Sequence, residues 1–420
     1  MSLRIISISE LKPGMFITEL DISWLNSPFL MKKKRIQSQN EIEVLVRSGA
    51  KKITIDLNQS DAACFEQETE EMTQLISEER DEKSNPAEAV KQPLSEVVKL
   101  AVELQEACKL KKEINQLGEK INCAIENNEP VNMQDITPII DKTISSLCRN
   151  DQALTSLLRH SKSQGKLTSH TFNVFTLSLM LATKLKVSEE DQQLLGVASL
   201  LHDSGWARLP GNLFSKGKPY TSTEKKLTTE HIKIVLKILE QSSSVPNIVA
   251  TIISQHHERC NGTGYPSSLT STNIHPLTKI MMIADTYDEM MQGIGEQPGM
   301  ISSLAISNLF KLAQQQQLDE TMCKAFVSAV GIYPIGCAVK LNTGEKGIVI
   351  ELNRDTPLNP IIKIYYNRLG NPMFKAHIVN LAKQDQAELK RKITSALNCN
   401  NKKDDPAQIL SPQDFEIKTQ

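Results

Sequence analysis

The stretch Leu200-Leu201-His202-Asp203-Ser204-Gly205-Trp206 sets a histidine beside an aspartate at the end of an apolar segment. Residues 194–201 are apolar enough to predict a buried helix, and Gly205 predicts its end. An imidazole is a borderline nitrogen ligand for metals, and a neighbouring carboxylate is short enough to bridge two cations. The pair is weak evidence by itself, because chance places His-Asp in many chains. The positions of the other histidines therefore decide whether the pair predicts a metal site.

The histidines are concentrated in one part of the chain. Seven of the eight lie between residues 160 and 275. Five helix-like segments each present one or two nitrogen or oxygen ligands at an end, and these ligands are His170, His202, Asp203, His231, His256, His257 and Asp285. Such an arrangement suits a helical bundle, whose facing helices project ligands inward. Each histidine alone would more often be an ordinary polar residue, but the set without any cysteine favours a site for iron, manganese or zinc.

These residues together resemble the HD-GYP domain family. The resemblance rests on His170, His202-Asp203, His231, His256-His257-Glu258-Arg259, Asn261-Gly262-Thr263-Gly264-Tyr265-Pro266 and Ala284-Asp285-Thr286-Tyr287-Asp288. It covers about residues 145–330. The resemblance implies an all-helical HD-type phosphohydrolase fold with two or three metals, commonly iron or manganese. It also implies hydrolysis of the cyclic dinucleotide c-di-GMP to linear pGpG or to GMP.

The resemblance implies a role for each of the metal ligands. His202 and Asp203 would be the catalytic residues, with Asp203 and a hydroxide bridging two divalent cations, iron or manganese. One cation would be held by His170, His202, Asp203 and Asp285, and the other by Asp203, His231, His256 and His257.

The substrate is expected to contact residues outside the ligand set. By resemblance, Tyr265, flanked by Gly264 and Pro266, would contact a guanine or a partner protein. The simpler alternative for this tripeptide is a rigid turn. Lys216, in a predicted loop over residues 209–223, is a candidate contact to substrate phosphate.

Three features depart from the family pattern. The usual His-Asp-x-Gly-Lys ends in Trp206, so a lysine expected at the phosphate is missing. Ahead of the first histidine, acidic residues that can bind a third metal are replaced by Gln164 and Lys166, so we expect two metals. Residues 292–298 lack the arginine that usually grips the phosphate. Removing one such donor typically costs about 3 kcal/mol of transition-state stabilisation.

The rest of the chain predicts smaller units on both sides of the helical domain. Residues 1–60 predict an α+β unit that resembles DUF3391, with strands at 5–8, 15–20 and 52–57 and a helix at 41–48. Residues 61–130 predict a charged linker and a helix at 94–125, residues 131–330 the HD-GYP domain, residues 331–385 a small β extension, and residues 386–420 a polar, mobile tail. The predicted fold class is therefore mainly α, an all-helical HD-type phosphohydrolase bundle flanked by a small N-terminal α+β domain and a small C-terminal β extension.

Composition narrows the classes of partner. The formal net charge of −1 gives no sign of general nucleic-acid binding, which needs a clustered basic surface. The eight cysteines form no regular framework and predict reduced thiols in a cytoplasmic protein. No apolar run reaches the ~18 residues of a membrane span.

Two classes of function remain open from the sequence. The favoured one is a metal-dependent c-di-GMP phosphodiesterase, slowed by the loss of phosphate cations or stopping at pGpG. The alternative is a catalytically weak or inactive module that binds c-di-GMP or a diguanylate cyclase (GGDEF) partner as a signalling receptor. Hydrolysis of another cyclic dinucleotide fits the HD chemistry but not the GYP triplet. The helix at 94–125 either supports a homodimer or packs against the catalytic domain.

Overall fold

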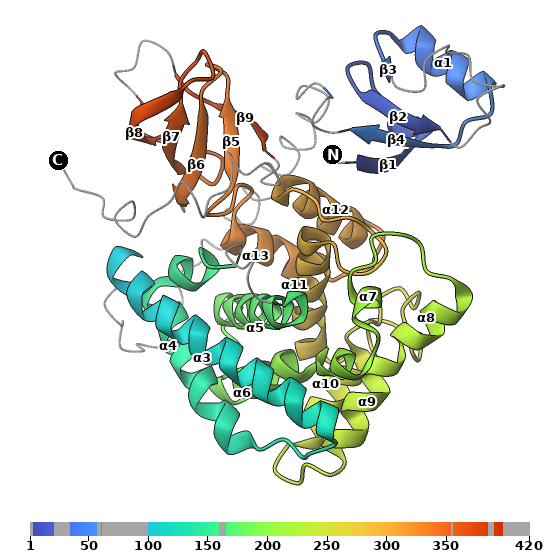
Figure 1. The fold of residues 1–420 in the computed structure, drawn as a ribbon, viewed down its shortest axis with the longest axis vertical. Coiled ribbons are helices and arrows are strands. Elements are labelled where there is room, and N and C mark those ends of the chain that lie inside the picture. Colours follow the sequence, from blue (N-terminus) through green and yellow to red (C-terminus); the bar gives the residue numbers. More distant parts are fainter. Residues whose placement is uncertain are drawn as a thin grey trace.

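The computed structural model describes residues 3–20, 34–56, 60, 100–158, 165–353, 356–384 and 390–397. A large helical domain occupies the lower part of Figure 1, and a small sheet from each end of the chain lies above it. This arrangement confirms the predicted fold class. The predicted linker, His160, Gln164 and most of the predicted tail lie outside the described residues. No described helix is both long and apolar enough to cross a membrane.

The N-terminal sheet has four antiparallel strands in the order β1-β4-β2-β3. Its strands are β1 (Leu3–Ser7), β2 (Phe16–Leu20), β3 (Lys34–Arg35) and β4 (Lys52–Asp56), with a 3-10 turn, η1 (Ile8–Glu10), after β1. The helix α1 (Gln39–Arg47) buries Ile42 and Leu45 against the sheet. On the central strand β4, Ile53 and Ile55 alternate with Thr54 and fill the same small core.

The helical domain contains the core from which the candidate ligands project. Its elements are α3 (Leu100–Asn127), α4 (Met133–Thr155), α5 (Lys166–Lys184), α6 (Glu189–Leu201), η4 (Ser204–Arg208), α7 (Gly211–Phe214), α8 (Ser222–Thr228), α9 (Glu230–Leu239), α10 (Asn247–Gln255), α11 (Pro276–Gln292), α12 (Ser302–Gln314) and α13 (Glu320–Val330). Residues 168–182 of α5 are all buried, which makes α5 the central helix. A surface helix keeps one charged or polar face, whereas α5 is buried on all sides and has no Asp, Glu, Lys or Arg between Lys166 and Lys184.

Capping residues define several helix ends. Ser188 accepts a hydrogen bond from the backbone N–H of Asp191 and starts α6, as the sequence predicts. Thr221 and Glu224 form a capping box at the start of α8. The predicted loop over residues 209–223 contains the short helix α7, so it is more ordered than expected.

The long helix α3 packs against the catalytic domain. It buries Leu110, Ile114 and Ile121 in the same core as α4 and α5. This contact confirms the simpler of the two interpretations of the helix predicted at 94–125. A homodimer stays a prediction.

The C-terminal sheet has five antiparallel strands in the order β8-β7-β6-β5-β9. They are β5 (Ala338–Leu341), β6 (Lys346–Glu351), β7 (Ile361–Tyr366), β8 (Pro372–Asn380) and β9 (Ile393–Ala396). The last strand corrects the prediction of a polar tail from residue 386, because β9 pairs with β5. An ion pair between Arg391 and Glu345, with Nε and Oε2 2.8 Å apart, holds the segment before β9 against the sheet. This long-range pairing is not visible in the polar local sequence.

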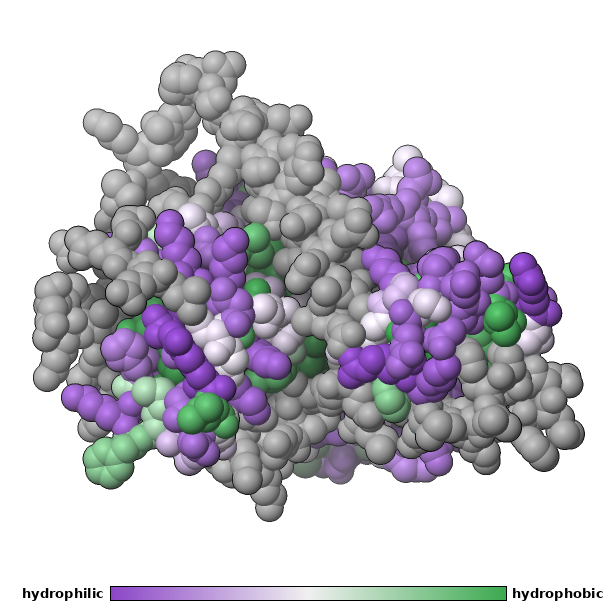
Figure 2. Space-filling model, turned by 90° about the horizontal axis from the view of Figure 1, so that it is seen from above, coloured by the Kyte–Doolittle hydropathy of each residue, from purple (hydrophilic) through white to green (hydrophobic). Residues whose placement is uncertain are grey.

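The described surface seen from above is mainly hydrophilic, with a few apolar residues between the polar ones (Figure 2). On the C-terminal sheet and its hairpin, Leu369, Phe374 and Ile378 are large apolar side chains exposed to solvent. Single exposed apolar residues are normal on proteins and do not by themselves indicate a binding surface.

Candidate metal centre

All seven predicted ligands converge inside the helical domain. They come from α5, from the ends of α6 and α10, from the start of α9 and from α11. Among the described residues, ligand atoms form three groups, and within each group the atoms lie within 4.8 Å of one another. The first group is Asp203, His231, His256 and His257, and the second is His170, His202 and Asp285. The third is His257, Asp285 and Glu289. The first two groups reproduce the predicted ligand sets, apart from the sharing of Asp203.

Three histidines are oriented by the helices that carry them. The Nδ1 atoms of His202, His231 and His256 lie 2.8, 2.5 and 2.6 Å from the carbonyl oxygens three residues earlier, Ser199, Thr228 and Ile253. Carbonyl groups at a helix end lack partners within the helix, so an imidazole N–H can satisfy them. Nδ1 therefore carries the proton, and each Nε2 lone pair faces the centre.

His170 is oriented by carboxylates instead. Its Nδ1 lies 2.8 Å from Asp288 Oδ2, while Asp288 also accepts hydrogen bonds from Asn173 at 2.7 Å and Gln292 at 2.5 Å. Its Nε2 lies 3.1 Å from Asp285 Oδ1. Asp288 thus fixes the ring from behind, which is the usual role of a carboxylate next to a ligand histidine.

Asp203 divides the centre into two halves. Its Oδ1 lies 3.3 Å from His231 Nε2 and 3.7 Å from His256 Nε2. Its Oδ2 lies 3.3 Å from His170 Nε2 and 3.8 Å from His202 Nε2. Each carboxylate oxygen therefore faces one pair of histidines.

The donor set fits divalent cations. The Nε2 atoms of His170 and His202 are 3.3 Å apart, and those of His231 and His256 are 3.4 Å apart. Lone pairs that face each other at such distances need a cation or a proton between them. In addition, Asp203 Oδ1 and Asp285 Oδ2 are buried without a hydrogen-bond partner. A buried polar atom without a partner costs about 1–3 kcal/mol, so coordination would relieve a real penalty.

Burial and neighbouring charges shift the pKa values of the histidines of the centre in different directions. Burial lowers the pKa of His231 to about 4, although Asp203 opposes this shift, so the His231 imidazole is neutral. Burial alone would lower the pKa of His170, but hydrogen bonds with Asp203, Asp285 and Asp288 outweigh it and raise the pKa. Burial would raise the pKa of Asp203, but the charges and hydrogen bonds of the histidines hold it well below its usual value. Both aspartates of the centre, Asp203 and Asp285, are ionised.

Comparison with known proteins connects this geometry to a family. A family model described as "HD domain" matches residues 147–322, which contain the whole ligand set. Models of DUF3391, a domain of unknown function, and of a KOW domain associated with HD domain match residues 3–136 and 338–398. The chain is an HD-GYP domain protein. The DUF3391 match continues through α3, beyond the predicted boundary at residue 60.

Relatives with curated names include two phosphodiesterases. The HD-GYP chain is 26% identical over 387 residues to cyclic di-GMP phosphodiesterase PA4108 of Pseudomonas aeruginosa, covering 92% of this chain and 91% of the relative. It is 25% identical over 193 residues to cyclic di-GMP phosphodiesterase PdeB of Borreliella burgdorferi, covering 46% of this chain and 50% of the relative. Bd1817, a HDG"Y"P protein from Bdellovibrio bacteriovorus, aligns with a TM-score of 0.45 at 18% identity, over 77% of this chain and 98% of that one.

The GYP loop of this HD-GYP domain packs directly on a predicted ligand, His257. The ring of Tyr265 stacks on His257, with centroids 4.8 Å apart. Glu258 holds the loop, because its buried carboxylate accepts hydrogen bonds from the backbone N–H groups of Ser267 and Leu269. A Cβ atom at Gly264 would lie 2.3 Å from the backbone nitrogen of Arg259, so only glycine fits there. Pro266 follows on the surface.

An apolar cluster occupies the side of the centre where the phosphate cations are missing. Trp206 stands where the family has a lysine, and Ile294 lies in the segment 292–298 that lacks the family's arginine; both are buried there with Leu213 and Phe214. The Phe214 ring also lies 5.8 Å from the His170 ring, edge to face. The two departures are therefore one structural feature, an apolar wall beside the ligands.

Hydrogen bonds join the segment that contains α7 to the loop after α11. The N–H groups of Gly217 and Gly295 donate to the carbonyls of Gly295 and Phe214, each at 2.9 Å. Glu296 accepts a hydrogen bond from the backbone N–H of Tyr220 at 2.6 Å, and Lys166 contacts Ser215. These bonds hold the apolar wall in place.

Lys216 is engaged away from the ligands. Its ammonium group pairs with Glu224 Oε2 at 2.5 Å and donates to the Pro219 carbonyl at 3.0 Å. Its role at the phosphate stays a prediction, and it would require the pair with Glu224 to open.

Sequence reasoning missed three acidic residues near the centre. Asp288 and Glu289 follow Asp285 on α11 at spacings of three and four, which place them on the same side of the helix. This spacing was the available signal. Burial, followed by repulsion from Asp285, raises the pKa of Glu289 to about 8. Glu258, which holds the GYP loop, carried no such signal.

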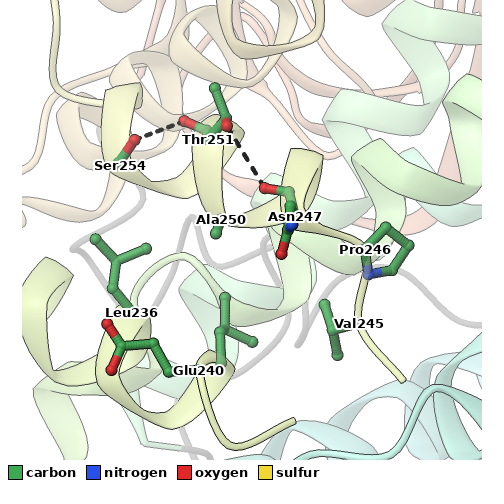
Figure 3. A pocket seen from close by; sticks show the side chains of 9 residues that line it. Leu236, Glu240, Val245, Pro246, Asn247, Ala250, Thr251 and Ser254 are labelled. Atoms are coloured by element: carbon green, nitrogen blue, oxygen red, sulfur yellow. Dashed lines mark hydrogen bonds between the residues drawn. The ribbon is translucent and has the colours of Figure 1, made fainter. Parts of the chain in front are cut away.

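A separate groove lies between α9 and α10 (Figure 3). It has a volume of about 340 Å³ and is lined by residues such as Leu236, Glu240, Pro246 and Ala250. None of the candidate ligands lines this groove, so the groove is separate from the candidate metal centre.

Proposed function

We propose that this HD-GYP protein is a metal-dependent phosphodiesterase that hydrolyses c-di-GMP to pGpG or GMP. The observation that carries the proposal is Asp203, whose two oxygens face separate histidine pairs at 3.3–3.8 Å. The names of the two phosphodiesterase relatives support c-di-GMP as the substrate.

The ligand assignment follows the two halves of the centre. His170, His202, Asp203 and Asp285 would hold one divalent cation, and Asp203, His231, His256 and His257 the other. Five imidazoles and two carboxylates without a thiolate favour iron or manganese. When bound, such a pair supplies Lewis acidity toward phosphate and lowers the pKa of water enough for attack near neutral pH.

Residues in and next to the GYP loop would position the substrate. Tyr265 presents an aromatic ring beside His257, suited to stacking on guanine. Gly264 lets the loop approach closely, and Pro266 continues the turn. Arg259 precedes this loop, and its charge acts on both Tyr265 and Glu289. Its guanidinium donates to the Glu258 carbonyl at 3.0 Å and forms no ion pair with another described residue, so its remaining N–H groups could meet a phosphate, as Lys216 could after leaving Glu224.

A receptor function is the second candidate, and the apolar wall favours it. Trp206 and Ile294 replace cations that would stabilise the phosphate during hydrolysis, whereas binding depends less on them. A receptor of this kind would bind c-di-GMP without turnover or contact a diguanylate cyclase (GGDEF) protein.

The test is turnover of c-di-GMP by anaerobically purified protein loaded with iron(II) or manganese(II). Linear pGpG or GMP is expected from the wild type and none from His202→Ala or Asp203→Ala. Tight binding without product under every metal would support the receptor instead. Faster turnover of another cyclic dinucleotide than of c-di-GMP would contradict the substrate assignment.

A further inference from the structure

Two hairpin turns, one between β5 and β6 and one between β7 and β8, lie together at one end of the C-terminal sheet. A Cβ atom at Gly344 in the first turn would lie 3.2 Å from the carbonyl oxygen of Arg368 in the second. The chain that leaves the opposite end of β6 contacts the helical domain, because the Leu352 N–H donates to Gln152 of α4 at 2.9 Å. The two turns therefore form the outer end of the sheet, away from the helices (Figure 1).

Two large apolar side chains project from this outer end. Leu369, in the turn between β7 and β8, is 85% exposed, and Phe374 on β8 is fully exposed. The turn is ordered, because the side-chain oxygen of Asn367 accepts hydrogen bonds from the N–H groups of Leu369 and Asn371. β8 also bulges here, since residues 373–376 lie opposite a single residue of β7. An ordered turn and a bulge thus hold both side chains in solvent.

Cations accompany the two apolar residues. Arg368 adjoins Leu369 and Lys375 adjoins Phe374, and both cations are exposed. Neither forms an ion pair with another described residue. Glu345, a carboxylate beside the first turn, already pairs with Arg391 through Nε and Oε2 at 2.8 Å.

The balance of charge in this part of the chain differs from that of the whole. Residues 338–398 contain ten lysines and arginines against five aspartates and glutamates, whereas the formal net charge of the chain is −1. In the view from above, which faces the outer end, apolar residues project between hydrophilic ones at the left (Figure 2). The outer end is therefore a cationic tip with exposed apolar side chains.

This combination fits an anionic lipid surface better than it fits a protein. Apolar side chains can enter the boundary between headgroups and acyl chains while neighbouring cations contact anionic headgroups. A strand of another protein would meet the bulge in β8, which interrupts a regular edge. A second copy of the chain would bring the cations of two outer ends together, where they repel.

We propose that the outer end of the C-terminal sheet docks on an anionic phospholipid bilayer. Leu369 and Phe374 would insert among the lipids, and Arg368 and Lys375 would contact the headgroups. Docking of this kind requires no membrane-spanning helix. The surface contains none of the predicted metal ligands, so its test is independent of the proposed phosphodiesterase activity.

The first test is sedimentation of the full chain with vesicles of phosphatidylcholine, pure or mixed with phosphatidylglycerol. The wild type should bind the mixed vesicles about tenfold more tightly than the pure ones, and Phe374→Ser and Arg368→Glu should each weaken binding to the mixed vesicles about tenfold. Val102→Ser and Lys112→Glu, at exposed positions of α3, are the matched controls and should bind like the wild type. No binding of the wild type to mixed vesicles, or equal affinity of the wild type and all four variants, would overturn the proposal.

A second measurement reports insertion without loss of binding. The tryptophan emission of Phe374→Trp should shift to shorter wavelength when mixed vesicles are added, and that of Val102→Trp should stay unchanged. An unchanged emission of Phe374→Trp on vesicles that bind the wild type would overturn insertion at this position.

Other polyanions provide the remaining comparison. Binding of oligouridylate or polyglutamate by the wild type, weakened in Arg368→Glu and accompanied by no binding to vesicles, would assign the outer end to nucleic acid or to an acidic protein. Either result would overturn docking on a bilayer.

Discussion

The indole of Trp206 lies almost parallel to the imidazole of His231, with 15° between the ring planes and 5.4 Å between the centroids. Trp206 also meets the Phe214 ring edge to face at 5.3 Å. The tryptophan therefore fills the space between the predicted ligand His231 and the segment that carries α7. Trp206, which stands in place of the expected lysine, is thus part of the apolar wall beside His231.

Restoring the cation at this position should increase turnover. Trp206→Lys is expected to raise kcat/KM for c-di-GMP at least tenfold, within a limit of about 3 kcal/mol for one such donor. Loss of the buried indole should lower the free energy of unfolding by about 3 kcal/mol. Kinetics and thermal unfolding of the same samples test both effects, with Trp206→Phe as the apolar control. A folded Trp206→Lys variant with unchanged kcat/KM would mean that the missing cation does not limit the reaction.

A methyl group at Gly205 should disturb the second half of the centre. The added Cβ would lie 2.1 Å from the carbonyl oxygen of His231, a backbone atom that can move only with α9. Gly205→Ala is therefore expected to lose metal at the His231 side and to reduce turnover more than tenfold. Gly211→Ala, where a Cβ would meet no atom within 4 Å, is the matched control. Equal metal content in the two variants would contradict this expectation.

Asp288 should act through His170. Its removal leaves the His170 Nδ1 proton without an acceptor, and residues of this kind typically change metal affinity 10- to 100-fold. Asp288→Ala is expected to weaken manganese(II) binding by that factor, measured by competition with a chelator. Unchanged affinity would show that the ring keeps its orientation without the carboxylate.

Lys111 should make stability depend on pH well away from the centre. Burial lowers the pKa of this lysine to about 8, and its ammonium lies 4.7 Å from the centre of the Phe172 ring. Because the folded-state pKa is below the unfolded value of 10.5, the unfolded chain binds more protons between these values, and stability rises from pH 8 to 10.5. Lys111→Met should raise the free energy of unfolding at pH 7 by about 1 kcal/mol and flatten this rise. Denaturant unfolding at pH 7 and pH 10 tests both; a lower stability at pH 7 would contradict the prediction.

The positions of most ligands could be predicted from sequence because they stand at or near the end of an apolar helix, whereas Asp285 was expected at a helix end and lies inside α11. His202 follows α6 and His257 follows α10, so the apolar period located them before their contacts were known. Their second partners could not be found in this way. The carbonyls behind His231 and His256 are backbone atoms, which carry no residue-specific signal.

The remaining differences arise from contacts between residues that are not neighbours in the sequence. The sequence shows Trp206 only as the loss of an expected lysine. In the structure it packs with Ile294, a residue about ninety positions away. The strand β9 forms only because β5 offers an edge to it. The charge of Lys216 suggests a contact to phosphate, whereas in the structure it pairs with Glu224, which the capping box of α8 holds in place. In each case the local sequence is compatible with several partners and tertiary packing selects one.

The most direct test measures bound metal and c-di-GMP turnover together while manganese(II) or iron(II) is titrated into protein stripped of metal. Turnover should be absent in the stripped protein and should appear only as the second ion binds, since Asp203 faces two histidine pairs. Asp203→Asn should remain inactive at every metal concentration. Full turnover by the stripped protein, or by Asp203→Asn, would contradict a metal-dependent phosphodiesterase built on this residue.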